Sequence, residues 1–346
     1  MCRPGSKDPL VSYDSACRRE TEALMSSLYP LLLIPIFDER PWGLRDLRPV
    51  YTKIVKEPIG ESWLTWHDNR IANGPFAGRT LGDIATEYKR ALVGSAAVCE
   101  DRFPLLVKFL FPSEKLSVQV HPDDAAARRA GEPCGKTECW YVLDAQPGAQ
   151  VALGLKGGTT TAEFAESIRE NGAEELLNWI NVYPGDMLFV AAGTVHTIGG
   201  GMVLVETQQT SDITYRLYDY GRGRELRIKD GIAAVRLNTR AGKVVHQAGD
   251  DPNMLVRSPF FQVEKLKLAT PLDARVTPES PHIIVAIGGS GIVESPGMEP
   301  ISFVQGEAVV VPATVPGYSV RPQWDLEVMR MSVPSGSVAE PVTKLG

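Results

Sequence analysis

Short apolar runs separated by turn residues dominate the pattern of this chain. Residues 104–111 form a nearly continuous apolar run, which is typical of a strand buried on both faces. Residues 115–121 alternate polar and apolar side chains, which predicts a strand with one polar face. A third run, residues 187–190, lies between Pro-Gly-Asp and Gly-Thr turn sequences. Repeated short strands with tight turns predict a mainly β protein.

Helical patterns are few and short. Thr80 with Asp83 three residues later predicts a capped helix start, and apolar residues at helical spacing follow it as far as residue 92. A second helix is expected over residues 161–171, where a glycine follows as the stop signal. A third short helix is expected over residues 176–180. These helices would be insertions in a β framework.

The chain also contains an internal echo. Residues 185–196 resemble residues 306–317 without a gap, and His196 then falls opposite Gly317. The same turn, strand and turn therefore occur twice. We expect two related β-barrels, of which the second has no counterpart of His196.

A second pair of segments supports the duplication. The strand-like segment that begins at His282 echoes the one that begins at Glu138, and a glycine turn follows each. Residues 247–253 are polar and rich in turn formers, so they are expected to link the two barrels. Small double-sheet jelly rolls fit this spacing of strands and turns.

Composition and charge exclude some classes of protein. The chain has 346 residues and a net charge of -6 with no basic stripe, so a nucleic-acid partner is not expected. Its longest apolar run, residues 28–37, contains two prolines and is too short to cross a bilayer. Residues 1–27 lack the order of a signal peptide and are expected to form a loose extension.

Cysteine usage points to a reducing compartment. The number of cysteines is odd, and no CxxC pair is present. Free thiols in the cytoplasm are the simplest interpretation. The five positions are Cys2, Cys17, Cys99, Cys134 and Cys139.

Four polar residues near strand ends form a candidate metal site. Gln119 and His121 are two residues apart, so on a strand they point to the same face. Glu138 opens a second strand-like run, and His196 follows the run at 187–190. Two imidazoles, a carboxylate and an amide oxygen suit a borderline divalent metal. By spacing alone, each residue could equally be an ordinary core or surface side chain.

Several segments together resemble one enzyme family. From about residue 35 to the C-terminus, the chain resembles the type I phosphomannose isomerases of the compact bacterial form, which have the cupin fold. The matching segments are Trp42-Gly43, residues 60–63, 116–124, 135–141 and 184–196, and residues 206–219, which form the longest match.

The resemblance implies a fold, a reaction and a cofactor. The expected fold is mainly β, with two cupin-type jelly-roll barrels and short helical insertions. Residues 28–246 would form the metal-binding catalytic domain, and residues 247–346 a degenerate cupin domain without metal. The implied reaction interconverts mannose 6-phosphate and fructose 6-phosphate through an enediol. One divalent metal per chain, normally zinc, would be bound by Gln119, His121, Glu138 and His196.

The resemblance also suggests the residues that act on the sugar. Lys136 and Arg216 are the candidate cations, and Glu206 is the candidate base at the end of an apolar run. The sequence does not separate Glu206, Asp212 and Lys136 as the base. Asp212 and Arg216 are four residues apart, so a surface ion pair is the alternative for these two.

Phosphate recognition has only a weak signal. The chain has no glycine-rich loop of the P-loop type. Ser117 and Lys115 precede the first two candidate ligands and are the candidates for binding the phosphate, although both could be solvent-facing strand residues. The sugar phosphate is the expected partner, with no nucleic acid and no membrane, and the oligomeric state stays open.

Two other functions remain open at this point. One is a different cupin enzyme, such as a metal-dependent oxygenase or another sugar-phosphate isomerase. An oxygenase would not need the charged set of Lys136, Glu206 and Arg216 for its chemistry. The other is a binding or regulatory cupin, which would be expected to lose that charged set.

Overall fold

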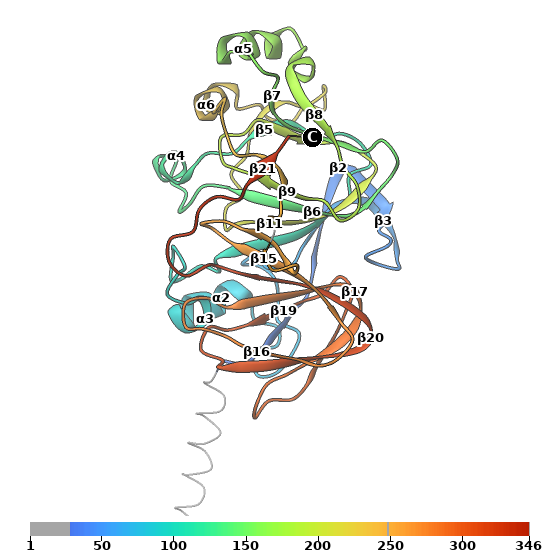
Figure 1. Ribbon diagram of the computed structural model, residues 1–346, viewed down its shortest axis with the longest axis vertical. Coiled ribbons are helices and arrows are strands. Elements are labelled where there is room, and N and C mark those ends of the chain that lie inside the picture. Colours follow the sequence, from blue (N-terminus) through green and yellow to red (C-terminus); the bar gives the residue numbers. More distant parts are fainter. Residues whose placement is uncertain (1–27, 248, 346) are drawn as a thin grey trace, which may run out of the picture.

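A computed structural model describes residues 28–247 and 249–345 of the chain. The described part is mainly β, as predicted, with three sheets and few helices (Figure 1). The sheets form two stacked barrels, one in the upper half of the view and one in the lower half. The expected loose extension, residues 1–27, lies outside the described residues.

Two facing sheets build the first barrel. The five-stranded sheet has the order β12-β5-β10-β7-β8, and the eight-stranded sheet has the order β2-β3-β4-β11-β6-β9-β13-β21. The strands of the smaller sheet are β5 (Val118–Val120), β7 (Gln150–Leu155), β8 (Leu177–Asn181), β10 (His196–Ile198) and β12 (Tyr215–Tyr218). Those of the larger sheet are β2 (Ile36–Asp46), β3 (Ile54–Trp63), β4 (Leu105–Leu110), β6 (Glu138–Ala145), β9 (Met187–Val190), β11 (Met202–Gln209), β13 (Gly242–Val244) and β21 (Thr343–Lys344).

The second barrel is one eight-stranded sheet curled around its own apolar core. Its main path is β1-β19-β17-β20-β15-β14, with β16 and β18 pairing at the sides. The strands are β1 (Leu31–Leu33), β14 (Met254–Arg257), β15 (Gln262–Leu268), β16 (Leu272–Arg275), β17 (His282–Glu294), β18 (Ile301–Val304), β19 (Ala308–Val311) and β20 (Gly317–Ser332).

The helices are short, and only part of their prediction is confirmed. They are α2 (Leu81–Tyr88), α3 (Arg90–Val93), α4 (Asp124–Arg129), α5 (Thr161–Arg169), α6 (Ile228–Ala234) and one 3-10 turn, η1 (Ala173–Leu176). Thr80 and Asp83 form the predicted capping box of α2. The predicted continuation to residue 92 is interrupted at Lys89, whose φ is 47°. None of the helices in residues 28–247 and 249–345 is long and apolar enough to cross a membrane.

The third predicted helix is wrong. Residues 177–180 lie on strand β8, which pairs with β7, and only η1 before them is helical. Ile180 therefore reaches the core between the two sheets, whereas Leu177 joins the apolar cluster that contains Phe164 and Ile168 of α5. Pairing with β7 outweighs the weak helical spacing of so short a segment.

Strand β4 explains the long apolar run of the sequence. Every residue of β4 is buried, as predicted. Val107 and Phe109 point to the core that joins the two barrels, whereas Leu110 belongs to the core between the sheets of the first barrel. Because neither face of β4 meets solvent, its sequence does not alternate between polar and apolar residues.

The expected strand over residues 115–121 is shorter than predicted and has no solvent-facing side. Only Val118–Val120 pair as β5, and Ser117 and His121 on the predicted polar face are buried. That face looks across the first barrel to the larger sheet. Its polar residues are therefore gathered inside the barrel.

The internal echo corresponds to equal strand pairing in both barrels. Glu138 pairs with Val190 between β6 and β9, and His282 pairs with Val311 between β17 and β19. His282 therefore occupies the place of Glu138 in the second barrel.

The terminal strands cross the predicted domain boundary. That boundary, at residue 247, lies between β13 and β14. However, β1 pairs with β19 in the second barrel, and β21 pairs with β13 in the first. Each end of the described chain thus closes the sheet of the other half, and one apolar core runs between the barrels.

Candidate active site

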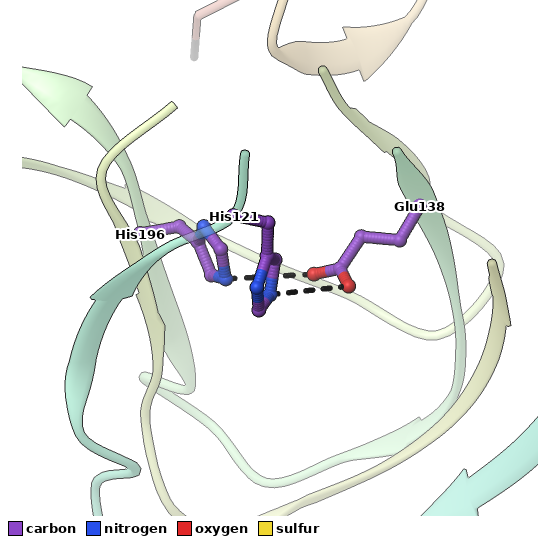
Figure 2. Close-up of side chains that lie close together, drawn as sticks. All are labelled: His121, Glu138 and His196. Carbon is purple, nitrogen blue, oxygen red and sulfur yellow. Dashed lines mark ion pairs between the residues drawn. The ribbon is translucent and has the colours of Figure 1, made fainter. Parts of the chain in front are cut away.

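Three buried side chains converge inside the first barrel. His121 follows β5, His196 opens β10, and Glu138 opens β6 on the facing sheet. The Nε2 atoms of both imidazoles lie 3.5 Å from the Glu138 carboxylate, each beside a different oxygen (Figure 2). One donor atom from each residue lies within 4.8 Å of the others. The structure thus brings together three of the four predicted metal ligands as a compact donor set.

Hydrogen bonds to the backbone orient both imidazoles. Nδ1 of His121 donates to the carbonyl of Ile213, and Nδ1 of His196 donates to the carbonyl of Thr194, each at 2.9 Å. A proton on Nδ1 leaves the Nε2 lone pair directed at the shared point. The backbone therefore selects the tautomer that a metal ligand needs.

Burial keeps these groups ready to bind a cation. Burial, with Lys136 and the second imidazole, holds the pKa of His121 well below its usual range. Burial also lowers the pKa of His196 to about 4. Nε2 of His121 and Oε2 of Glu138 have no hydrogen-bond partner among the described residues. Two neutral imidazoles and a buried carboxylate, two of whose facing atoms lack hydrogen bonds within the described chain, fit a divalent cation such as zinc.

Gln119 lies directly opposite His196 across the β5–β10 pair. Its amide nitrogen is 3.2 Å from Nε2 of His196, and its amide oxygen accepts from Ser117 at 3.0 Å. The fourth predicted ligand is therefore adjacent to the donor set. In this orientation its amide nitrogen, rather than its oxygen, faces the imidazole.

A polar cavity of 330 Å³ opens beside the donor set. It lies between the two sheets of the first barrel, and acidic and basic residues line it in equal number. The acidic residues are Glu39, Glu61, Glu138, Glu206 and Asp212, and the basic residues are Arg40, Lys108, Lys136, Arg216 and Arg224. Such a lining suits a small, highly polar ligand more than an apolar one.

Lys136 and Glu206 face each other within this cavity. The Lys136 ammonium is 3.2 Å from Glu138 and 3.9 Å from Glu206. Burial opposes its charge, but Glu138, Glu206 and Asp212 outweigh burial and raise the pKa of Lys136. Burial, followed by the negative charge of Glu138, raises the pKa of Glu206 to about 7. The cavity thus holds a protonated lysine beside a carboxylate that can exchange a proton near neutral pH.

The sequence interpretation missed Lys108. Its side chain is only 3% exposed, and its ammonium lies 3.7 Å from Glu206 and 3.7 Å from Asp212. The signal was present, because Lys108 is the one charged residue in the apolar run 104–111. A lysine buried on a core strand needs paired carboxylates. That requirement would have identified it as a candidate.

Arg216 lines the cavity without the ion pair that the sequence allowed. No ion pair between Arg216 and Asp212 occurs among the described residues, where Asp212 instead pairs with Lys108. Arg216 donates to the carbonyl of Glu225 at 3.0 Å, and its buried Nε has no partner there. Arg216 therefore presents an unused donor near the cavity.

Two further arginines line the same cavity and were also missed. Arg224 is held by Asp219, with Nε donating at 2.8 Å, and Arg40 is held by Asp38 at 2.7 Å. Their carboxylate partners outside the cavity orient both guanidiniums. Only the fold brings these two segments beside Arg216.

The two predicted phosphate contacts separate in the structure. Ser117 lines the cavity and donates to Gln119. Lys115 lies outside the cavity, where it pairs with Glu174 and sits over the ring of Trp179. Two residues apart on one strand would share a face, but Lys115 precedes β5 and follows the loop outward.

Known proteins match this chain over most of its length. Residues 42–153 match the family model for the catalytic domain of type I phosphomannose isomerase. The mannose-6-phosphate isomerase ManA of Bacillus subtilis is 37% identical over 300 residues, which cover 82% of this chain and 93% of that protein. The chain belongs to the type I phosphomannose isomerases.

Solved phosphomannose isomerase structures share the fold. The mannose 6-phosphate isomerase from Bacillus subtilis superposes with a TM-score of 0.76 at 30% identity, over 88% of this chain and 99% of that one. A zinc-bound holo mannose 6-phosphate isomerase superposes with a TM-score of 0.69 at 17% identity, over 88% of this chain and 99% of that one. At that identity the second likeness concerns the cupin fold alone.

Proposed function

We propose that this type I phosphomannose isomerase interconverts mannose 6-phosphate and fructose 6-phosphate with the help of one bound divalent metal ion, zinc. The observation that carries the proposal is the pair of oriented imidazoles facing the buried carboxylate of Glu138, at the wall of a cavity lined by acidic and basic residues in equal number. Family membership supplies the reaction class.

The ion would be held by His121, Glu138 and His196, with Gln119 beside them. When bound, it supplies Lewis-acid stabilisation for the negative charge that develops on the sugar oxygens during isomerisation. The backbone carbonyls behind the two imidazoles fix the ring positions, so little reorganisation is needed during turnover.

The reaction moves a proton between C1 and C2 of the open-chain sugar through an enediol. Glu206 is the proposed base, because its buried carboxylate lines the cavity between the ammonium groups of Lys108 and Lys136, and burial raises its pKa. Lys136 is less suited, because the surrounding carboxylates keep it protonated. Asp212 is less suited, because 47% of its side chain is exposed.

Lys108 and Lys136 are the proposed cations beside the reacting oxygens. Their ammonium groups approach Glu206 from β4 and from the segment just before β6. Charged donors in a site screened from water stabilise the developing enediolate and raise kcat. Both lysines would also limit how far the Glu206 carboxylate can move.

Arg224 and Arg40 are the proposed phosphate ligands, and Arg216 is the proposed guanidinium contact to the reacting sugar. Arg216 carries an unpaired buried Nε, and Arg224 and Arg40 line the same cavity. Guanidinium groups match the oxygens of a phosphate in two-point contacts. The charge of a dication at the metal site would also be balanced by that of a phosphate dianion beside the arginines, so the cavity would stay balanced in charge when both are bound. Ser117 remains a candidate contact, whereas Lys115 lies outside the cavity.

A chelation and restoration assay tests the proposal. Purified protein should form fructose 6-phosphate from mannose 6-phosphate in a coupled assay, lose that activity after chelation, and regain it with added zinc. Elemental analysis should follow the same course. Full turnover by a preparation that contains no metal would refute the metal dependence, and no turnover by the metal-loaded protein would refute the reaction.

A further inference from the structure

A buried carboxylate on β3 contacts two cavity cations without facing the metal ligands. We propose that Glu61 is a positioning residue, which fixes the ammonium of Lys108 so that Glu206 keeps a free oxygen for the substrate proton. The inference rests on the proposed function, since it concerns how Lys108 and Glu206 work together.

Each carboxylate oxygen of Glu61 has its own partners. Oε2 accepts from the indole nitrogen of Trp63 at 2.6 Å and lies 3.4 Å from Nζ of Lys108. Oε1 lies 3.4 Å from Nε of Arg40. Glu61 is only 9% exposed, so its charge is buried together with these partners. A buried carboxylate with this many cationic contacts stays ionised.

Burial by itself would raise the pKa of Glu61. Lys108, Arg40 and the indole of Trp63 together overcome burial and lower the pKa of Glu61 to about 2. The ion pair is therefore present over the whole neutral range. Replacing a buried ion pair with apolar residues often costs little stability, so core stability alone gives weak reason for this arrangement.

Trp63 completes a cradle around the lysine. Trp63 lies opposite Lys108 across the β3–β4 pair, and the Lys108 ammonium sits 4.3 Å from the centre of its ring. On the other side, Glu206 lies opposite Lys108 across the β4–β11 pair. Glu61 and the ring face thus hold one side of the ammonium, and Glu206 is on the other.

The geometry predicts what happens when Glu61 loses its charge. A lysine side chain has a flexible stem of four carbons, so its ammonium can move toward the carboxylates that remain. For Lys108 these are Glu206 and Asp212, each 3.7 Å away. A closer pair with Lys108 would lower the basicity of Glu206 and occupy one of its oxygens. The chemical step would slow without loss of a substrate contact.

The local backbone allows Arg40 to approach Glu61 closely. Residues 40–43 bulge out of β2, because Glu39 and Leu44 both pair with Ile59. A side chain at Gly60 would meet the Cβ atom of Arg40 at 2.5 Å. The glycine therefore lets Arg40 approach β3 beside Glu61.

The first experiment compares Glu61→Gln with Asp38→Asn. Gln keeps the shape and can still accept from Trp63, but it removes the charge next to Lys108. We expect kcat to fall about tenfold, with the KM for mannose 6-phosphate within about twofold and metal content unchanged. Asp38→Asn removes the other carboxylate partner of Arg40, a proposed phosphate ligand, so it should raise the KM for mannose 6-phosphate while kcat stays near the wild-type value. Equal loss in both variants would overturn the proposal, since Glu61 would then act through Arg40.

A double-mutant cycle with Lys108→Met identifies the residue through which Glu61 acts. In that background Glu61→Gln should change kcat by less than about twofold, because the group that it positions is already gone. A further tenfold loss would overturn the proposal. The same cycle in urea unfolding measures the Glu61–Lys108 coupling without any turnover, and absence of coupling there would overturn the contact itself. Wild-type turnover separately tests the proposed function.

Discussion

Lys108 and Glu206 lie directly opposite each other on β4 and β11, and their charged groups are 3.7 Å apart. Lys136 reaches the same carboxylate from just before β6, at 3.9 Å. The proposed base of the isomerase is therefore held between a lysine on β4 and a lysine in the segment just before β6. Each lysine limits where the carboxylate can go, and together they favour its charged form against burial.

Glu206→Gln tests the proposed base. The amide keeps the size of the side chain but cannot accept a proton from the sugar, so kcat should fall at least about a hundredfold. Metal content should be unchanged, because Glu206 is not in the donor set. Asp212→Asn is the matched comparison and should cost less. A larger loss in Asp212→Asn than in Glu206→Gln would move the base assignment to Asp212.

His121→Ala and His196→Ala should each abolish both metal binding and activity while the chain stays folded. Each change removes one imidazole from the donor set, and the remaining groups hold a borderline cation poorly. His282→Ala is the matched control, because His282 has the equivalent strand position to Glu138 in the second barrel. Elemental analysis should give one metal per wild-type chain. A second tightly bound ion that survives loss of both first-barrel imidazoles would contradict the prediction.

Arg216→Lys should lower kcat by about one order of magnitude or more with metal content unchanged. Lysine keeps the charge but loses the planar fork of donors, including the unpaired Nε. Arg227→Lys is a suitable control, since Arg227 forms an exposed pair with Asp230. Near-wild-type kcat in Arg216→Lys would refute its role and leave the lysines as the principal cations.

Arg224→Ala and Lys115→Ala compare a proposed phosphate ligand with the phosphate contact that the sequence predicted. Removing Arg224 should raise the KM for mannose 6-phosphate about tenfold or more, since a charged hydrogen bond to the substrate is lost. Lys115→Ala should leave KM nearly unchanged, because its ammonium pairs with Glu174 outside the cavity. The reverse pattern in steady-state kinetics would restore Lys115 as the phosphate ligand.

His282 should make the folded state less stable in acid. Burial, followed by the positive charge of Arg330, lowers the pKa of His282 to about 4. The unfolded chain then binds the proton more readily, so the stabilisation is present above about pH 6.5 and is lost as the pH falls toward 4. In urea unfolding, the wild type should lose about 2 kcal/mol more than His282→Gln between pH 7 and pH 5. Parallel losses in both proteins would contradict this.

The sequence by itself determined most of the framework. The all-apolar run at 104–111 indicated a strand buried on both sides, and β4 has that environment because two cores cover it. The capping box at Thr80 indicated a helix start, since its hydrogen bonds are local. Spacing and family motifs together identified His121, Glu138 and His196 as candidate metal ligands, because side chains two residues apart on a strand lie on the same face.

Only the tertiary structure decided which residues share the cavity. Period two assigns a side chain to a face but says nothing of its neighbour on the next strand, because that neighbour depends on the register of strands far apart in sequence. Thus Glu206 meets Lys108 by register, Asp212 pairs with that lysine instead of Arg216, and Arg224 enters from a loop. Lys115 lies outside the site because β5 begins only at Val118, and the chain before β5 places its ammonium beside Glu174.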